Sequence, residues 1–339
     1  MNRKYNNFDL LRLILSIIVV IVHTAELSQI EAMARFSRYF SSVIAVDSFF
    51  IVSGFLIFMS FDNSSSLYSF AIKRVRRIAP AYSVVILLSS LILFFVSTQS
   101  FDSYFNIEFI RYIFFNLITL NFLQPTINGL FADNHIQAIN GALWTIKIEV
   151  SFYIIVPIIG YLLHKTNKLF LLTTIYTLSI SYSLILFWLY QTSSLEIYLK
   201  LEKQIFGQLA FFVSGALIYY FYDTFKKRSI YLLIISIIIL WVHHFIINIY
   251  FLYPIALAIS IIYFATQFKY LGDFGKYGDI SFGIYIWHFP IIQVFVHYHL
   301  FDNLLLGLIL LIISLLTISL LSWHFIEKRF LYTTSHYRR

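Results

Sequence analysis

Two ionisable side chains that lie within long apolar stretches could carry out acid-base chemistry. His23 lies near the end of the first such stretch, and Glu149 lies early in a later one. A carboxylate that binds an imidazole fixes its tautomer, and the ring can then take a proton from a hydroxyl group near neutral pH. The pair therefore suits a general base. Hydrogen bonding between membrane helices is the alternative interpretation of the same two residues.

Three further polar residues occupy apolar stretches. Arg12 precedes His23 by eleven residues, so the two lie roughly 16 Å apart along one helix. Asp47 and His288 lie in two other stretches. Ionisable residues within a membrane span are costly and usually mark a site. We expect His23, Asp47 and Glu149 in the outer half of the membrane and His288 near its middle.

A basic cluster, Lys73, Arg74, Arg76 and Arg77, immediately precedes the predicted start of the third span near Pro80. Four cations in five residues could bind a polyphosphate. A basic cluster beside a span is also a common determinant of topology or a contact with anionic lipid, and its spacing does not separate these alternatives.

The elements that carry these residues are predicted to be membrane helices. The chain has 339 residues, of which 60% are hydrophobic and 12% charged, and its mean hydropathy is +0.82. Repeated apolar runs long enough to cross about 30 Å of hydrocarbon predict an all-α polytopic bundle. A shorter stretch, Phe109 to Leu123, is interpreted as re-entrant or interfacial. The ten predicted spans are Phe8 to Glu26, Tyr39 to Phe61, Ala79 to Ser97, Ala142 to His164, Leu169 to Tyr190, Gln204 to Tyr222, Ser229 to Ile247, Asn248 to Phe268, Asp279 to His299 and Asn303 to Phe325.

The distribution of charge predicts the orientation of the spans. Most of the 24 Lys and Arg residues fall in alternate loops, which places both termini in the cytoplasm and explains the net charge of +8 without nucleic acid.

The chain has no cysteine, which excludes thiolate nucleophiles and thiolate metal sites. The neighbouring histidines lack a third ligand at a suitable spacing, so no metal site is predicted.

Six blocks, in the same order, resemble the integral-membrane acyltransferase-3 family, whose members acylate extracytoplasmic glycans. One departure is that Lys328 follows Glu327, where the family commonly has proline. The blocks are FDLLRLILSIIVVIVH with Arg12 and His23, VDSFFIVSGFLIF with Asp47, Phe50, Ser53, Gly54 and Phe55, KRVRRIAPAY with Arg74, Arg77 and Pro80, LWTIKIEVSFYIIVP with Trp144, Thr145, Glu149, Phe152 and Tyr153, SFGIYIWHFPI with Ser281, Tyr285, His288 and Pro290, and WHFIEKRF with Glu327.

The resemblance implies roles for these residues. His23 would be the catalytic base or a transient acyl carrier, and Glu149 would assist it. The donor would be held by Arg12, Lys73, Arg74, Arg76 and Arg77. The site lining would comprise Asp47, Ser53, Trp144, Thr145, Tyr285 and His288. The resemblance also implies a single membrane domain over 1–339, with a short cytoplasmic tail at 330–339 and no fused esterase-like domain.

The function implied by the resemblance is transfer of an acetyl or other acyl group from cytoplasmic acetyl-coenzyme A to a hydroxyl of a cell-surface polysaccharide or its lipid-linked precursor. Acyl-coenzyme A is then a co-substrate, with no permanently bound cofactor, and the expected location is the bacterial cytoplasmic membrane. The alternatives are a transporter or flippase that uses the buried charges as a proton relay, and a structural partner in polysaccharide assembly. The sugar, the acyl group and the oligomeric state do not follow from the sequence.

Overall fold

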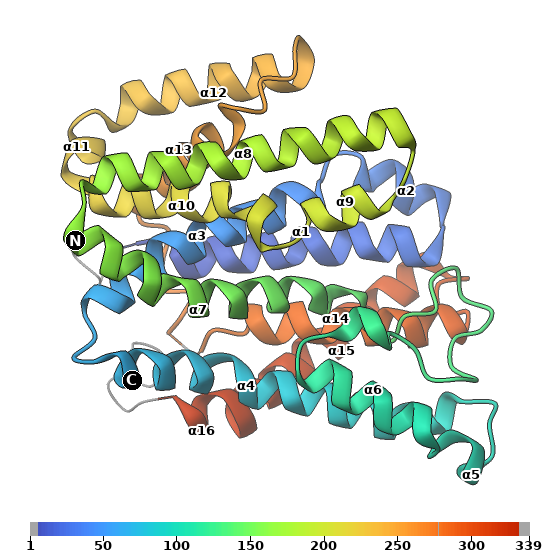
Figure 1. The fold of residues 1–339 in the computed structure, drawn as a ribbon. Coiled ribbons are helices and arrows are strands. Elements are labelled where there is room, and N and C mark those ends of the chain that lie inside the picture. The colour runs from blue at the N-terminus through green and yellow to red at the C-terminus, as the bar shows by residue number, and fades with distance from the viewer. Residues whose placement is uncertain (1–5, 277, 332–339) are drawn as a thin grey trace. The chain divides into compact units, whose positions relative to one another are not determined.

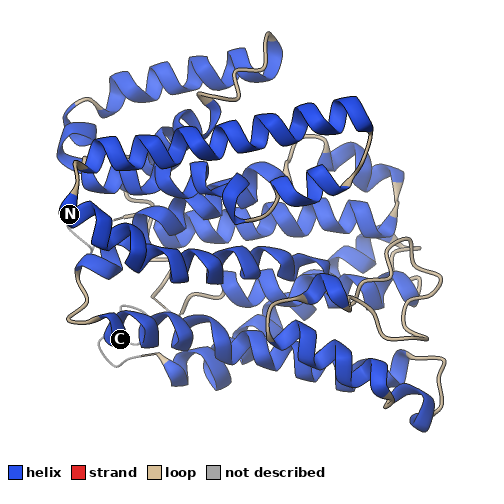
Figure 2. Ribbon diagram, viewed as in Figure 1, coloured by secondary structure: helices blue, strands red, loops and turns tan. Residues whose placement is uncertain are grey.

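The computed structural model describes residues 6–276 and 278–331, and every regular element in these residues is helical (Figure 2). Among the described residues, six helices are long and apolar enough to cross a membrane. The predicted polytopic helical membrane bundle is therefore confirmed. The six are α1 (Phe8–Ser28), α3 (Ser42–Asp62), α4 (Leu67–Ile92) with its extension η1 (Leu93–Val96), η3 (Gly141–Leu143) with α7 (Trp144–Lys165), α8 (Lys168–Ser193), and α15 (Leu304–Ser322) with η4 (Trp323–Glu327) and α16 (Lys328–Phe330).

The four other predicted spans are also helices, but they are shorter. They are α10 (Ile205–Tyr220), α12 (Ser229–Phe245), α13 (Tyr253–Thr266) and α14 (Ser281–His297). At the helical rise, 14 to 17 residues cover roughly 21 to 26 Å, less than the hydrocarbon thickness of about 30 Å. The cytoplasmic location of both termini stays a prediction, and residues 332–339 of the predicted tail lie outside the described residues.

Several short helices lie between the long ones. The stretch interpreted as re-entrant forms α6 and η2, with eleven and three residues, and neither is long enough to cross a bilayer. The short elements are α2 (Glu31–Ser37), α5 (Phe101–Tyr104), α6 (Ile107–Leu117), η2 (Asn121–Leu123), α9 (Ile197–Glu202) and α11 (Tyr222–Lys227).

The predicted start of the third span at Ala79 is wrong, because α4 begins twelve residues earlier, at Leu67. The hydroxyl of Ser66 accepts a hydrogen bond from the backbone N–H of Ser69 at 3.1 Å and caps the first turn. Pro80 lies inside the helix, where membrane helices tolerate it. The basic cluster is consequently part of α4 and does not precede it.

Contacts within the described residues group the chain into two compact units, each assembled from three stretches. The first unit comprises Met1–Leu11, Val46–Ala71 and Ile148–Asp273, and the second comprises Arg12–Ala45, Ile72–Lys147 and Phe274–Arg339. The single domain expected over 1–339 stays a prediction.

In the first unit, α10 packs against both α8 and α13, and α8 and α10 run side by side (Figure 1). Glycines allow α3 to approach α10 very closely. A Cβ atom at Gly54 would lie 1.8 Å from the carbonyl oxygen of Phe212, and one at Gly215 would lie 2.0 Å from that of Ile51. Small residues at membrane helix interfaces commonly serve this purpose. Gly54 of the family-like block is therefore explained by packing.

In the second unit, α14 packs against α15 (Figure 1). The long segment before α7 is tied to α14 through Gln293, whose side chain is buried. Its amide donates to the backbone oxygens of Ile136 and Ala138 at 2.6 and 2.7 Å, and its oxygen accepts from Asn134 at 2.8 Å. This polar network gives the segment a defined position on α14.

Candidate active site

The second unit joins α1 to the α14 segment at two places. Arg12 forms an ion pair with Asp279, with 3.2 Å between Nη1 and Oδ2. Further along both segments, Nδ1 of His23 lies 2.8 Å from Nε2 of His288. Because the earlier residues pair with each other and the later residues do likewise, the two segments run in the same direction. This direction agrees with the topology predicted from the charge distribution.

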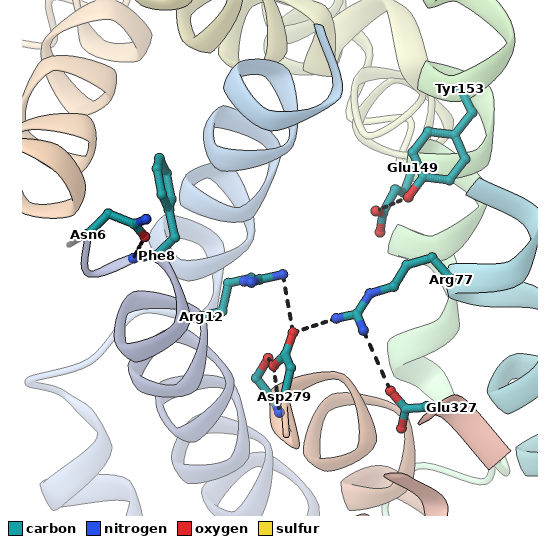
Figure 3. Close-up of polar contacts among 9 residues, drawn as sticks. Asn6, Phe8, Arg12, Arg77, Glu149, Tyr153, Asp279 and Glu327 are labelled. Atoms are coloured by element: carbon teal, nitrogen blue, oxygen red, sulfur yellow. Dashed lines mark hydrogen bonds and ion pairs between the residues drawn. The ribbon is translucent and has the colours of Figure 1, made fainter. Parts of the chain in front are cut away.

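The first place is an ionic cluster formed by Arg12, Arg77, Asp279 and Glu327 (Figure 3). Asp279 accepts from Arg77 at 2.5 Å as well as from Arg12, and its side chain is only 2% exposed. Nη1 of Arg77 lies 4.0 Å from Glu327, which also accepts a hydrogen bond from Ser322. Arg12 and Arg77, two of the residues that were expected to hold the donor, therefore contact buried carboxyl groups.

The second place is the histidine pair, His23 and His288, whose tautomers follow from their partners. Nδ1 of His288 lies 2.6 Å from the backbone oxygen of Tyr285 and must donate, because a carbonyl only accepts. In the neutral ring, Nε2 of His288 then accepts a hydrogen bond from Nδ1 of His23. A neutral His23 protonated at Nδ1 keeps its lone pair at Nε2, so this atom can take a proton or attack an acyl group.

The surroundings distinguish the two rings. His288 is fully buried, whereas the side chain of His23 is 18% exposed. Nε2 of His23 lies 3.9 Å from a carboxylate oxygen of Glu26, one helical turn further along α1. The ring of Phe289 meets His23 edge to face at 5.6 Å. His23 is consequently the more accessible ring of the pair, and His288 lies buried behind it.

The start of α7 is also tied to this place. The hydroxyl of Thr145 lies 3.1 Å from the backbone oxygen of Ala142 and shares a hydrogen bond of 2.7 Å with the hydroxyl of Tyr285. Tyr285 therefore contacts Thr145 with its side chain and His288 with its backbone. Trp144, the preceding residue, is half-buried at the first position of α7. The predicted residues Thr145, Tyr285, His288 and His23 form one connected chain of hydrogen bonds.

Three predicted residues belong to the first unit. Glu149 accepts a hydrogen bond from Tyr153 one turn later, at 2.5 Å (Figure 3). Asp47 is buried and accepts from Tyr253 at 3.3 Å. Ser53 is half-buried on α3. The predicted assistance of His23 by Glu149 stays a prediction, and Nδ1 of His23 is engaged by His288.

Asp47 belongs to a polar group that the sequence analysis did not anticipate. Its partner Tyr253 stacks on Tyr250, whose hydroxyl donates to Glu202 at 3.4 Å. Ser183 also donates to Glu202, at 3.3 Å. Burial raises the pKa of Glu202, which lies at the end of α9.

The remaining predicted cations lie on α4. Lys73 and Arg74 are half-buried and Arg76 is exposed. At 100° per residue, Lys73 and Arg77 share one face of the helix, and Arg74 lies beside them toward a second face. The structure describes no group of three or more His, Cys, Asp or Glu residues in 6–276 and 278–331 that could hold a metal ion.

Asp279, Glu327 and Glu26 were missed or given little weight in the sequence analysis. Asp279 served only as a helix boundary, although a carboxylate at the start of an apolar run is a natural partner for Arg12 in a helix of the same direction. Glu26 had a usable signal, because residues three apart on a helix are neighbours.

The amino-acid sequence of the chain is similar to those of known proteins. Residues 5–324 match the sequence family described as "Acyltransferase domain". The chain is 27% identical to the O-acetyl transferase of Shigella phage Sf6 over 98% of each chain. It is 29% identical to Nodulation protein 10 of Rhizobium leguminosarum bv. viciae over 45% of this chain and 44% of that protein. No solved structure matches the chain. The chain thus has several helices that can span a membrane, and it belongs to the acyltransferase-3 family.

Proposed function

We propose that the protein transfers an acetyl group from cytoplasmic acetyl-coenzyme A to a hydroxyl of a bacterial cell-surface polysaccharide or its lipid-linked precursor, in the cytoplasmic membrane. The observation that carries the proposal is the hydrogen-bonded series from Tyr285 through His288 to His23, which leaves a lone pair on Nε2 of His23. Similarity to a phage protein named O-acetyl transferase supports acetyl as the group and oxygen as the acceptor atom.

The reaction would begin with the acceptor hydroxyl beside Nε2 of His23. This nitrogen takes the hydroxyl proton as the oxygen attacks the thioester carbon, so a C–O bond forms and the C–S bond breaks. The coenzyme A thiolate leaves and takes the proton from His23. Nε2 of His288 accepts the hydrogen bond from Nδ1 of His23 throughout, as the carboxylate does in a catalytic triad. Glu26 would stabilise the transient imidazolium from 3.9 Å.

An acyl-histidine route uses the same nitrogen. Nε2 would attack the thioester carbon, so a C–N bond forms and coenzyme A leaves as its thiolate. The acceptor hydroxyl would then attack the acyl carbon, so a C–O bond forms, the C–N bond breaks, Nε2 is free again and the hydroxyl proton passes to the thiolate. This route releases one equivalent of coenzyme A and leaves an acylated enzyme before any acceptor arrives, whereas direct transfer does not. The two routes are separated by measuring coenzyme A release in the absence of glycan.

The other predicted residues take supporting roles in the proposal. Lys73, Arg74 and Arg76 would hold donor phosphates on the cytoplasmic side, where acetyl-coenzyme A is available. Arg12 and Arg77 would share this field while Asp279 fixes their positions. Glu149, Asp47 and Ser53 would line the path of the acceptor.

The test is acetyl transfer by the purified protein in lipid vesicles, with labelled acetyl-coenzyme A and lipid-linked glycan extracted from the cells in which the protein naturally occurs. The parent is expected to release coenzyme A and label the glycan, and His23→Ala to abolish both at matched abundance. Glu149→Gln measures whether that carboxylate assists. A parent protein that neither binds nor consumes acetyl-coenzyme A while moving the glycan lipid across the vesicle would overturn the proposal.

A further inference from the structure

A cavity of about 390 Å³ lies in the first unit, outside the histidine pair and the ionic cluster. It forms where the ends of α3, α7 and α10 meet the starts of α4 and α8. The predicted topology places all five of these helix ends on the cytoplasmic side. The volume is within the range of small-molecule sites.

One wall of the cavity is apolar and is held in place by close packing. It includes the ring of Phe61 together with Pro157 and Leu163. Phe61 meets Phe70 edge to face at 5.2 Å. A Cβ atom at Gly160 would lie 2.3 Å from the Phe61 ring, so the glycine allows this ring to lie against α7. The wall therefore presents a fixed aromatic surface.

The lining of the cavity also carries a cation and hydrogen-bonding groups. Lys168 lies over the ring of Tyr220, 4.8 Å from its centre, and His164 lies in the last turn of α7. Asp62 accepts from the hydroxyls of Tyr219 and Tyr220 at 3.1 and 3.2 Å. Each carboxylate oxygen of Asp62 accepts one of these hydrogen bonds and can accept another from an amino group.

Backbone polarity within the lining also favours an anion. The first residues of α4 and α8, Leu67 and Lys168, both line the cavity. Helix starts carry unpaired N–H groups and the positive end of the helix dipole. Together with the ammonium of Lys168, they create a field that suits a phosphate group next to an apolar surface.

We propose that this cavity binds the 3′-phosphoadenosine end of the acyl-coenzyme A donor, a proposal that rests on the function proposed above. The purine lies against Phe61, and its amino group donates to Asp62. The 3′-phosphate contacts Lys168 and His164. The basic cluster begins six residues after Leu67 on the same helix, roughly 9 Å along its axis, so the diphosphate follows α4 toward Lys73.

The experiment compares donors that differ only at the proposed contact. The KM is measured for acetyl-coenzyme A and for its 3′-dephospho analogue with the parent, Lys168→Ala and Lys165→Ala. Lys168→Ala is expected to raise the KM for acetyl-coenzyme A about tenfold, as for loss of a charge-assisted contact, and to leave the KM for the analogue within about twofold. Lys165 lies over Tyr161 and not in the cavity, so its variant is the matched control.

A second variant tests the aromatic wall. Gly160→Ala places a methyl group against Phe61 and moves its ring, which is expected to raise the KM for both nucleotide donors and leave that for acetyl-pantetheine unchanged. Equal changes for all three donors, or no change with either variant, would overturn the cavity assignment while acetyl transfer persists. So would a Lys168→Ala effect that appears only in vesicles with anionic lipid. A parent that uses no acyl-coenzyme A would instead refute the proposed function itself.

Discussion

The histidine pair and the ionic cluster connect the same two segments but satisfy their polar groups differently. In the ionic cluster, two guanidinium groups converge on the 2% exposed side chain of Asp279, and Glu327 is equally buried. In the histidine pair, one ring is buried and the other keeps an exposed edge and a lone pair. Paired opposite charges fix the two segments in position, whereas an oriented neutral base can exchange a proton.

Mutations in the histidine pair and mutations in the ionic cluster are therefore expected to change different measured properties. Changes in the histidine pair are expected to alter transfer and to leave folding intact. Changes in the ionic cluster are expected to alter folding first, because they leave a buried charge without its partner. Separate measurement of transfer and of thermal unfolding in detergent distinguishes these effects.

The largest effect is expected from His23→Ala. Loss of a positioned general base lowers the rate of transfer by about 10² to 10⁴-fold. The midpoint of thermal unfolding is expected to stay close to that of the parent, because the ring is partly exposed. His297→Ala is the matched control, since this histidine lies at the end of α14 against Phe131. Equal loss in both variants would contradict a special role for His23.

The next effect is expected from Asp279→Leu in the ionic cluster. Removal of the carboxylate leaves Arg12 and Arg77 facing an apolar side chain, at a cost of about 3 to 5 kcal/mol in the free energy of unfolding. Thermal unfolding and membrane abundance measure the loss. Arg77→Met added to this variant is expected to cost less than it does in the parent. Additive losses would show that Asp279 and Arg77 are not coupled.

The smallest effect is expected from Glu327→Gln. The amide oxygen can still accept from Ser322, and the contact with Arg77 is long, at 4.0 Å. A loss of about 1 kcal/mol in the free energy of unfolding follows, with transfer unchanged. A loss as large as that of Asp279→Leu would show that Glu327, and not Asp279, anchors Arg77.

Sequence reasoning predicted the helical architecture well because membrane spans carry a strong compositional signal. It failed at the start of α4, where the proline at position 80 was taken as a helix boundary although membrane helices tolerate internal proline. It also overestimated the length of four spans, because apolar residues continue beyond the last helical turn of α12 and before the first of α13.

The sequence predicted several residues of the candidate site but not the contacts between them. His23, His288 and Tyr285 were named, but a hydrogen bond between two histidines 265 positions apart leaves no local pattern. Asp279 was overlooked because a single carboxylate before an apolar run resembles an ordinary helix start. Pairings of this kind depend on which helices are neighbours, and helix spacing alone does not determine that.

The most direct test of the account compares two substitutions of the positioning histidine, His288→Gln and His288→Leu, by single-turnover acetyl transfer at matched abundance. A glutamine amide can accept the Nδ1 proton of His23, whereas leucine cannot. We predict that His288→Gln retains transfer within about tenfold of the parent and that His288→Leu loses about 10² to 10⁴-fold. Transfer by His288→Leu equal to that of the parent would contradict the oriented histidine pair as the centre of the reaction.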